Sequence, residues 1–262
     1  MTTTESGQLF RQGRLAEAVA AAEQSVRQHP AGIGGRVLLA EYLLFAGDFE
    51  RADAVLVAAE AVEPEAALVV AEFRQLLRAA SARRLLFSAG RVPDFLGSPT
   101  PMQTGMLRAL VALRAGDHEA AAHAAADAEA CRPQVAGVAN AAAFTDMRDA
   151  DDLCSGSFEV LTTTGKYYWI PAERVASMNF HPPKRPRDLF WRRCTMTVRD
   201  GPDGDVYLPA LYDVPADAPE AVRLGHLTEW TDANPVRGCG QRVFLVGEEG
   251  IPVTQLQTVE FA

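Results

Sequence analysis

The pattern of hydrophobic and polar positions changes near residue 145 of the 262-residue chain. Before it, alanine and leucine dominate and lysine is absent; after it, threonine, valine, tyrosine, tryptophan, proline and glycine become frequent. Alanine and leucine favour helices, whereas β-branched and aromatic residues favour strands. A run of helices followed by a run of strands indicates separate domains rather than alternating α/β units. We therefore predict an α+β protein with two domains, at 1–140 and 141–262.

The helical half contains a repeated glycine–alanine–proline pattern. Each copy reads G-x-x-x-x-A, and a proline follows 17 residues after the glycine: Gly13, Ala18 and Pro30; Gly47, Ala52 and Pro64; Gly116, Ala121 and Pro133. The first two glycines are 34 residues apart, and the third follows 69 residues later, close to two such units. A period of 34 residues is typical of tetratricopeptide-like helix pairs. The glycine would turn the chain, the alanine would let paired helices approach, and the proline would end the second helix.

This repeat places the helices along the first half of the chain. We expect them near 15–29, 35–46, 50–62, 65–88, 102–115 and 118–131, with a frayed first helix at 5–12. The unit expected between the second and third copies fits poorly, so 65–88 is predicted as one longer helix. Residues 91–101 would form an irregular connection.

Short strand-like runs separated by turn signals make up the second half. They start near Phe158, Lys166, Ala176, Arg192, Asp205, Arg223, Gln241 and Pro252. Gly165 and the sequence DGPDG read as hairpin turns, and the run from Met147 reads as the bridge between the halves. About eight strands of this length predict a small barrel or a strongly twisted sheet.

Charge and composition exclude several classes of protein. The chain has 34 acidic and 25 basic residues, a net charge of −9 and a pI near 5.1, which argues against nucleic-acid binding by phosphate neutralisation. No apolar run approaches the roughly 20 residues of a membrane span. The first residues do not resemble a secretory signal, and the four cysteines show no CxxC spacing, so we expect a cytoplasmic protein with reduced thiols.

Catalytic and metal-binding motifs are missing from the sequence. It has no phosphate-binding GKS or GKT, no GxSxG, and five dispersed histidines, so we expect no enzyme activity, cofactor or metal. One alternative is a hydrolase with a site around His181, Asp188 and Glu229. The acidic run at 146–152 could bind a hard cation, but such runs more often cap a helix or lie in solvent.

Two further groups of side chains allow alternative interpretations. The only dense basic stretch, from Lys184 to Arg193, is a candidate polyanion site, but the net negative charge opposes this role. We expect it instead to pair with the abundant carboxylates or with an acidic partner. The three tryptophans, Trp169, Trp191 and Trp230, are expected to pack in the core. Surface binding by a tryptophan is the alternative, because Trp, Tyr and Arg carry much of the energy of protein interfaces.

The order of strings in the second half resembles a known family. FTDMRDADDLCSGSFEVL, GKYYWIPAERV, PPKRPRDLFWRRCTM, LPALY, LGHLTEWT and GCGQRVFLV follow one another from residue 144 onward. They resemble the ImpE/TagJ family, also called SciE-type virulence proteins, which are accessory components of bacterial type VI secretion systems. The residues that carry the resemblance are Tyr167, Tyr168, Trp169, Arg187, Asp188, Trp191, Glu229, Trp230, Gly238, Gly240, Gln241 and Arg242.

The resemblance implies a non-enzymatic adaptor with a helical repeat domain and a β-barrel-like domain. Its partners would be the small subunit of the contractile sheath and the Clp-class ATPase that disassembles the sheath. Helical repeats present a concave face that suits an amphipathic helix of a partner. The candidate groove residues are Arg36, Glu41, Tyr42, Glu72, Arg74 and Gln75. We expect Trp230 and the run Gly240–Gln241–Arg242 to be mainly architectural.

Overall fold

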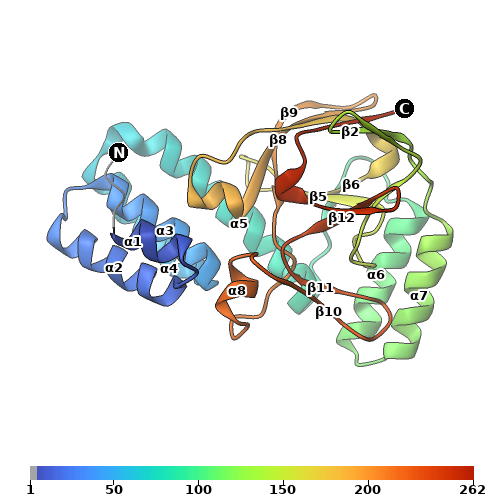
Figure 1. Ribbon diagram of the computed structural model, residues 1–262, viewed down its shortest axis with the longest axis horizontal. Coiled ribbons are helices and arrows are strands. Elements are labelled where there is room, and N and C mark those ends of the chain that lie inside the picture. The colour runs from blue at the N-terminus through green and yellow to red at the C-terminus, as the bar shows by residue number, and fades with distance from the viewer. Residues whose placement is uncertain (1–4) are drawn as a thin grey trace.

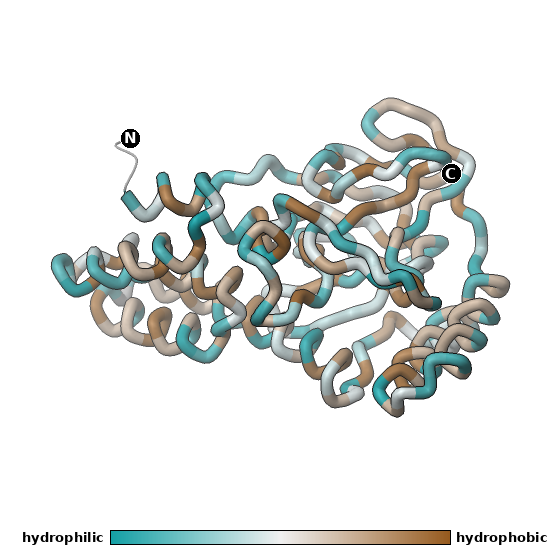
Figure 2. The backbone as a smooth tube through the Cα atoms, turned by 60° about the horizontal axis from the view of Figure 1, so that its bottom comes forward, coloured by the Kyte–Doolittle hydropathy of each residue, from teal (hydrophilic) through white to brown (hydrophobic). Residues whose placement is uncertain are grey.

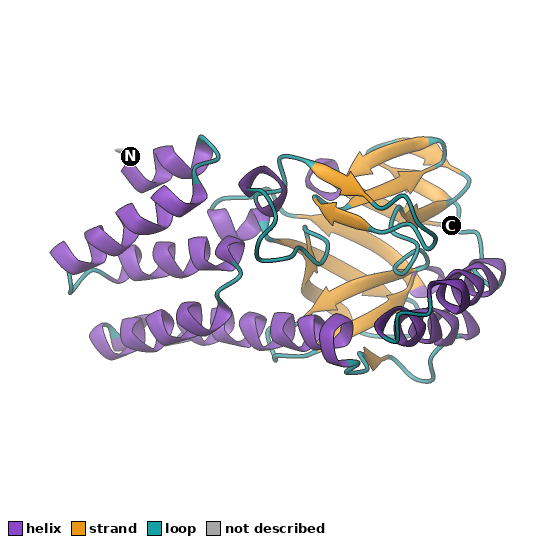
Figure 3. Ribbon diagram, turned by 90° about the horizontal axis from the view of Figure 1, so that it is seen from below, coloured by secondary structure: helices purple, strands orange, loops and turns teal. Residues whose placement is uncertain are grey.

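The computed structural model describes residues 5–262 and places a layer of helices beside an open β-sheet (Figure 1). Helices α1 (Glu5–Arg11), α2 (Leu15–Gln28), α3 (Ile33–Ala46) and α4 (Phe49–Val62) form one end of the molecule. The long helix α5 (Ala67–Ala89) follows the short helix η1 (Pro64–Ala66) and runs from this layer to the sheet (Figure 3). Helices α6 (Pro101–Arg114) and α7 (His118–Ala130) form a separate hairpin beside the sheet.

The glycine–alanine–proline pattern has the structural role that the sequence predicts. The three glycines close the turns between α1 and α2, α3 and α4, and α6 and α7, with positive φ angles: Gly13 (+80°), Gly47 (+77°) and Gly116 (+76°). The three alanines that follow them are fully buried. All predicted helices are present, and their observed ends differ from the predicted ones by no more than two residues. The helix expectation is therefore confirmed.

Within residues 5–262, nine strands form the main sheet, in the order β1-β6-β5-β9-β8-β7-β14-β2-β3. Its strands are β1 (Asp94–Phe95), β2 (Gly137–Ala139), β3 (Ala142–Phe144), β5 (Ser157–Leu161), β6 (Tyr167–Pro171), β7 (Val175–Phe180), β8 (Trp191–Val198), β9 (Asp203–Pro209) and β14 (Thr258–Phe261). The neighbours are antiparallel except β1, which lies parallel to β6. Short helices η2 (Ala172–Arg174), η3 (Pro186–Leu189) and η4 (Val253–Gln255) lie in the connections.

Two smaller sheets and one short helix complete the strand-rich half. Strands β13 (Glu249–Pro252), β12 (Val243–Val246) and β4 (Met147–Asp149) form a three-stranded sheet. Strands β10 (Thr228–Trp230) and β11 (Gly238–Gly240) form a two-stranded ribbon, preceded by α8 (Glu220–Arg223). None of the helices in residues 5–262 is both long and apolar enough to cross a bilayer.

The main sheet is open, so the expectation of a small barrel was wrong. Within the described part of the chain, its outermost strands β1 and β3 pair on one side only. A barrel is a single sheet closed on itself, which removes its edges. Here each face is covered by other elements, because one hydrophobic cluster joins it to the helices and a second joins it to the three-stranded sheet.

Alternation along the strands separates these two clusters. Tyr167 and Trp169 of β6 belong to the cluster with α3, α4 and α5, whereas Ile170 packs with Phe158 and Phe244 on the opposite face. Figure 2 shows the resulting brown, hydrophobic stretches along strands in the interior. Because the first cluster continues from the helices onto the sheet, the two halves share buried side chains, and the division at 140/141 stays a prediction.

The structure also differs from three smaller expectations. The connection predicted as irregular contains β1, and the predicted bridge contains β4, which pairs with β12. The last predicted strand is divided into η4 and β14. These elements are only two to four residues long, so their strand character depends on partners far away in the sequence.

Candidate functional site

A network of buried charges joins α5 to the strands. Arg83 of α5 donates two hydrogen bonds to Glu159 of β5, with Nε–Oε1 and Nη2–Oε2 distances of 2.8 and 3.0 Å. Arg242 also donates to Glu159 and reaches Asp149 of β4, at an Nη1–Oδ2 distance of 2.7 Å. All four side chains are buried. Since an unpaired buried charge is costly, each of these groups needs its partners.

Aromatic side chains complete the hydrogen bonding of this network. The Tyr167 hydroxyl donates to Glu159 and accepts from Nε1 of Trp169 at 2.6 Å. The Tyr212 hydroxyl donates to Oδ1 of Asp149 at 2.8 Å, and the Arg242 guanidinium lies 5.2 Å from the centre of the Tyr212 ring. The network therefore fixes how α5, β4, β5, β6 and the segment before β12 lie together.

The electrostatics of this network indicate a structural role. Burial opposes ionisation of Glu159, but the adjacent Arg83 and Arg242 guanidinium groups lower its pKa to about 2. Burial raises the pKa of Asp149 to about 6, although Arg242 counteracts it. A carboxylate held by two arginines is a poor general base. Perturbed pKa values of this kind accompany structural ion pairs as well as active sites.

Helix α8 attaches the strand-rich half to two helix ends. Both carboxylate oxygens of Glu220 accept hydrogen bonds from the first turn of α2, from the backbone N–H groups of Leu15 (3.0 Å) and Ala16 (2.8 Å). Nε of Arg223 donates to the carbonyl oxygen of Phe45, at the end of α3, at 3.1 Å. An acid at a helix N-terminus and a base at a C-terminus both complement the helix dipole.

A segment between β7 and β8, residues 181–190, packs against the helices; we call it the strap. Its Arg187 is buried, lies 4.8 Å from the centre of the Phe73 ring and has Nη2 3.5 Å from Oε1 of Glu72. Phe190, at the end of the strap, packs edge-on against Phe45, with a centroid distance of 5.1 Å. The strap therefore places a cation between α3 and α5.

Glu41 of α3 faces the strap, and no group among the described residues donates a hydrogen bond to its Oε1. This oxygen lies 3.9 Å from Nε of both Arg185 and Arg187, which is too far for a hydrogen bond. Burial raises the pKa of Glu41 to about 7, although both arginines counteract the shift and Asp188 adds to it. Glu41 therefore titrates near neutral pH, unlike an ordinary glutamate.

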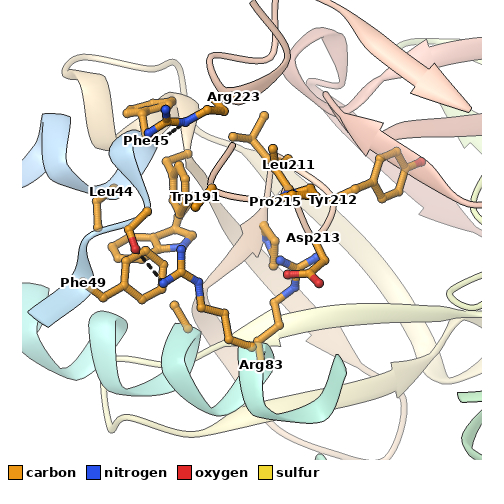
Figure 4. Close-up of a pocket in the computed structure, with 17 residues that line it drawn as sticks. Leu44, Phe45, Phe49, Arg83, Trp191, Leu211, Tyr212, Asp213, Pro215 and Arg223 are labelled. Atoms are coloured by element: carbon orange, nitrogen blue, oxygen red, sulfur yellow. Dashed lines mark hydrogen bonds between the residues drawn. The ribbon is translucent and has the colours of Figure 1, made fainter. Parts of the chain in front are cut away.

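The pocket at the seam between helices and strands is small (Figure 4). Its volume is about 40 Å³, and its walls include Phe49, Trp191, Leu211 and Asp213. Arg84 lies along one wall, 3.6 Å from the centre of the Phe49 ring. Ligand pockets usually measure about 300–1,000 Å³, whereas a water needs only about 10–15 Å³. This pocket has room for a few waters but not for an organic substrate.

The six candidate groove residues do not form one surface. Glu41 and Tyr42 are buried, because the side of α3 that carries them packs against the strap and Phe10 of α1. Buried side chains cannot meet a partner without repacking. Four half-buried residues remain for the predicted groove: Arg36, Glu72, Arg74 and Gln75.

The remaining groove candidates also make contacts within the chain. Nε of Arg74 donates to Oδ1 of Asp53 on α4 at 2.7 Å, and Glu72 accepts a hydrogen bond from the Tyr207 hydroxyl at 2.7 Å. Arg36 donates to the carbonyl oxygen of Pro30, and Gln75 accepts from Arg78 at 3.3 Å. Partner binding by these residues stays a prediction.

The alternative hydrolase site is not assembled. Nε2 of His181 lies 2.9 Å from Oγ1 of Thr195, and Asp188 accepts hydrogen bonds from the backbone of the strap. Glu229 is exposed on β10, in another sheet. Among residues 5–262, no hydrogen bond or ion pair joins any two of these three, and no three metal-ligating side chains come together.

The acidic run has a different role from those considered in the sequence. Its carboxylates neither cap a helix nor lie free in solvent; each binds an arginine, a backbone N–H group or both. The pairs within it are Asp146–Arg132, Asp149–Arg242, Asp151–Arg237 and Asp152–Arg148. The basic stretch also pairs with carboxylates, as in Arg193–Asp205, so the expected pairing with carboxylates of the chain is confirmed.

Among the tryptophans, Trp230 differs from the expectation of core packing. Trp169 and Trp191 are buried, but Trp230 is 41% exposed, so this part of the expectation was wrong. The Trp230 ring packs edge-on against the Tyr212 ring, with a centroid distance of 5.7 Å. β10 lies in a two-stranded ribbon outside the main sheet, which leaves the other side of Trp230 uncovered.

The other family residues make structural contacts. Gly240 has a φ of +112°, and a Cβ there would lie 2.1 Å from the carbonyl oxygen of Leu227. Gln241 donates through Nε2 to Oγ1 of Thr254 at 2.8 Å, and Tyr168 is half-buried with the Lys166 ammonium 5.9 Å from its ring centre. These contacts stabilise the end of β11 and the starts of β12 and β6.

Sequence reasoning missed Arg83, Glu159 and the pairing of Asp149 with Arg242. A weak signal existed, because Glu159 interrupts the apolar run of β5 and Arg83 interrupts a helix rich in apolar residues. Buried charges in such positions require partners. Nothing in the spacing identifies those partners, which lie between 76 and 93 residues apart.

Comparison with known proteins supports the family assignment over almost the whole chain. A model of the ImpE protein family matches residues 141–260. The type VI secretion system accessory component TagJ of Pseudomonas aeruginosa is 30% identical over 256 residues, covering 97% of this chain and 90% of that protein. The crystal structure of protein VPA1032 from Vibrio parahaemolyticus superposes with a TM-score of 0.91 at 25% identity, covering 99% of this chain and 98% of the other. The chain therefore belongs to the ImpE/TagJ family of type VI secretion accessory components.

Proposed function

We propose that this protein is a non-enzymatic, cytoplasmic adaptor of a type VI secretion system. It binds a helical segment of the small sheath subunit and is linked to the Clp-type ATPase that disassembles the sheath. The observation that carries the proposal is the similarity to TagJ over 97% of the chain, which includes the helical layer as well as the sheet. The unassembled hydrolase residues favour binding over catalysis.

The helical layer is the proposed binding surface. Paired helices with glycine turns resemble tetratricopeptide-like repeats, which bind partner segments along their faces. A shallow groove between α4 and α5 is lined by Asp53, Arg74 and Leu77. Near the corner between these helices, Val62, Leu68 and Val69 are exposed, and Leu68 is 82% exposed. Exposed apolar side chains beside a polar groove suit an amphipathic helix.

Charge defines the complementary partner segment. The corner between α4 and α5 also carries the exposed Glu63 and Glu65, and the protein has a net charge of −9. We therefore expect the bound segment to be apolar on one face and neutral or basic beside it. Because apolar burial supplies most of the affinity, binding should weaken only moderately with salt.

The test is an equilibrium titration of the cognate small sheath subunit against the full chain. The full chain is needed because the two halves share a hydrophobic cluster. Leu68→Asp should weaken binding by about tenfold or more, which corresponds to roughly 1.4 kcal/mol. Val111→Asp makes the same kind of apolar-to-acidic change at an exposed position on α6. It should leave binding unchanged, because Val111 lies outside the α1–α5 layer.

Two results would contradict the proposal. If the unmodified chain shows no binding to the sheath subunit, the adaptor role is wrong for this protein. If the chain binds but Leu68→Asp binds as tightly as the unmodified chain, or Val111→Asp weakens binding as much as Leu68→Asp, the α4–α5 surface is wrong. Circular dichroism of both variants provides the control, since each replaces an exposed side chain and should preserve the fold.

A further inference from the structure

The family string Thr228–Glu229–Trp230 forms a strand with a free edge. In the described residues, β10 pairs only with β11, in the register Thr228↔Gly240, Glu229↔Cys239 and Trp230↔Gly238. β10 is the outer strand of this ribbon (Figure 1). The proposed sheath contact lies on the helical layer and does not use this strand.

Hydrogen-bond alternation shows which backbone groups face outward. The N–H group of Thr231 donates to the carbonyl oxygen of Arg237, so these two residues form a hydrogen-bonded pair. In an antiparallel ladder such pairs recur at every second residue, which makes Glu229↔Cys239 the next one. The N–H and C=O groups of Thr228 and Trp230 therefore point away from β11. They are available to a further strand.

Apolar side chains flank this edge in a fixed arrangement. Leu227 is 50% exposed and Trp230 is 41% exposed. Trp230 is held in place by Tyr212, whose hydroxyl is bound to the buried Asp149. Gly238 makes this contact possible, because a Cβ there would lie 2.3 Å from the Tyr212 ring and 3.0 Å from the Trp230 ring. A rigid, half-exposed tryptophan is typical of a binding hot spot.

Exposed carboxylates lie along the edge. Glu229 and Asp232 are exposed, and within residues 5–262 neither they nor Asp213 takes part in an ion pair, whereas the nearby cation Arg237 is directed to the buried Asp151. Burial raises the pKa of the nearby Cys239 thiol, and Glu229 and Asp213 raise it further, although Arg237 counteracts them. These carboxylates therefore act on the same small region, and they favour a basic partner.

We propose that β10 is a second docking site, at which an extended segment of another protein adds as a strand. The backbone of the segment pairs with Thr228 and Trp230. Leu227 and Glu229 lie on one face of the extended chain at 227–232, and Trp230 and Asp232 lie on the other, because side chains alternate along a strand. On each face the segment therefore carries an apolar residue, beside Leu227 or Trp230, and a basic residue two positions away, beside Glu229 or Asp232. Strand addition combines backbone hydrogen bonds with side-chain selection in this way.

The test uses a displayed library of random dodecapeptides, selected against the full chain. Enriched peptides should carry an apolar and a basic residue two positions apart on each face, and their binding should weaken by about tenfold or more in Leu227→Asp and Trp230→Asp. Leu245→Asp, at a comparably exposed position on β12, is the matched control and should bind normally. Hydrogen exchange with bound peptide should slow at the Thr228 and Trp230 amides.

Other results would overturn the docking site. These are a selection without enriched sequences, enriched peptides that bind Leu227→Asp and Trp230→Asp normally, or protection outside residues 227–231. Methylation of alternate backbone nitrogens in the peptide must abolish binding, because strand addition needs those N–H groups. Sedimentation of the free chain tests whether a second copy of the protein occupies the edge. A dimer that dissociates in Trp230→Asp would assign the edge to that second copy instead. None of these outcomes depends on sheath binding.

Discussion

Replacing Glu41 by glutamine should remove a pH dependence of stability that originates at the strap. Glu41 is buried between α3 and the strap, and its pKa is about 7, against an ordinary value of 4.5. A folded-state pKa above the unfolded one means that the folded protein holds this proton more tightly. The stabilisation is therefore complete below about pH 4.5, and is lost as the pH rises towards about 7.

The magnitude follows from the same two pKa values. Each pKa unit corresponds to about 1.36 kcal/mol, so the wild-type chain should lose roughly 3 kcal/mol relative to Glu41→Gln across this range. The assay is urea unfolding of both proteins at several pH values between 4.5 and 8. Asp149, with a pKa of about 6, affects both proteins alike and cancels in the difference. Glu60→Gln, at a half-exposed position on α4, is the control and should follow the wild type.

Parallel stability curves of the two proteins would contradict a raised pKa of Glu41. If wild-type and Glu41→Gln stabilities differ by a constant amount from pH 4.5 to 8, Glu41 does not titrate near neutral pH. A difference that grows in the wild type's favour as the pH rises would show a stabilising ion pair with Arg185 and Arg187 instead. In that case the 3.9 Å separations would have to shorten in solution.

Three further predictions concern the core, a glycine and catalysis. Trp191→Ala should lower the free energy of unfolding by about 3–5 kcal/mol, because Trp191 is buried against Phe73 and Phe190, and Trp230→Ala should cost clearly less; equal losses would contradict this. Gly240→Ala should cost about 1–3 kcal/mol or more, and more than Gly116→Ala, whose added Cβ would meet no atom within 4 Å; thermal unfolding compares the two. A broad substrate screen should show no hydrolase, nucleotidase or metal-dependent turnover, and turnover that disappears in His181→Ala would contradict the adaptor role.

The sequence predicts the helical layer well because its signals are local. Gly13, Gly47 and Gly116 lie at turns that require a positive φ, and the buried alanines follow at a fixed spacing. The sheet is predicted less well, since its strand order depends on pairings between distant residues. Two-residue β1 pairs with β6 more than 70 residues away, and no local pattern specifies that contact.

The site could be predicted only in part for the same reason. The family residues identify Arg187, Trp191 and Arg242 as important, but spacing does not show that Arg242 meets Asp149 and Glu159 in the interior. Trp230 was assigned to the core on residue type alone. Its exposure follows from β10 lying in a separate ribbon, which is a property of the tertiary structure.

The proposed function requires the helical layer to hold a segment of the small sheath subunit. Hydrogen exchange of the full chain, measured with and without the cognate subunit, locates that contact directly. We expect slower exchange in α4 and the first half of α5, around Leu68. Protection confined to the strand-rich half, residues 141–262, would show that the sheath subunit does not bind the helical layer.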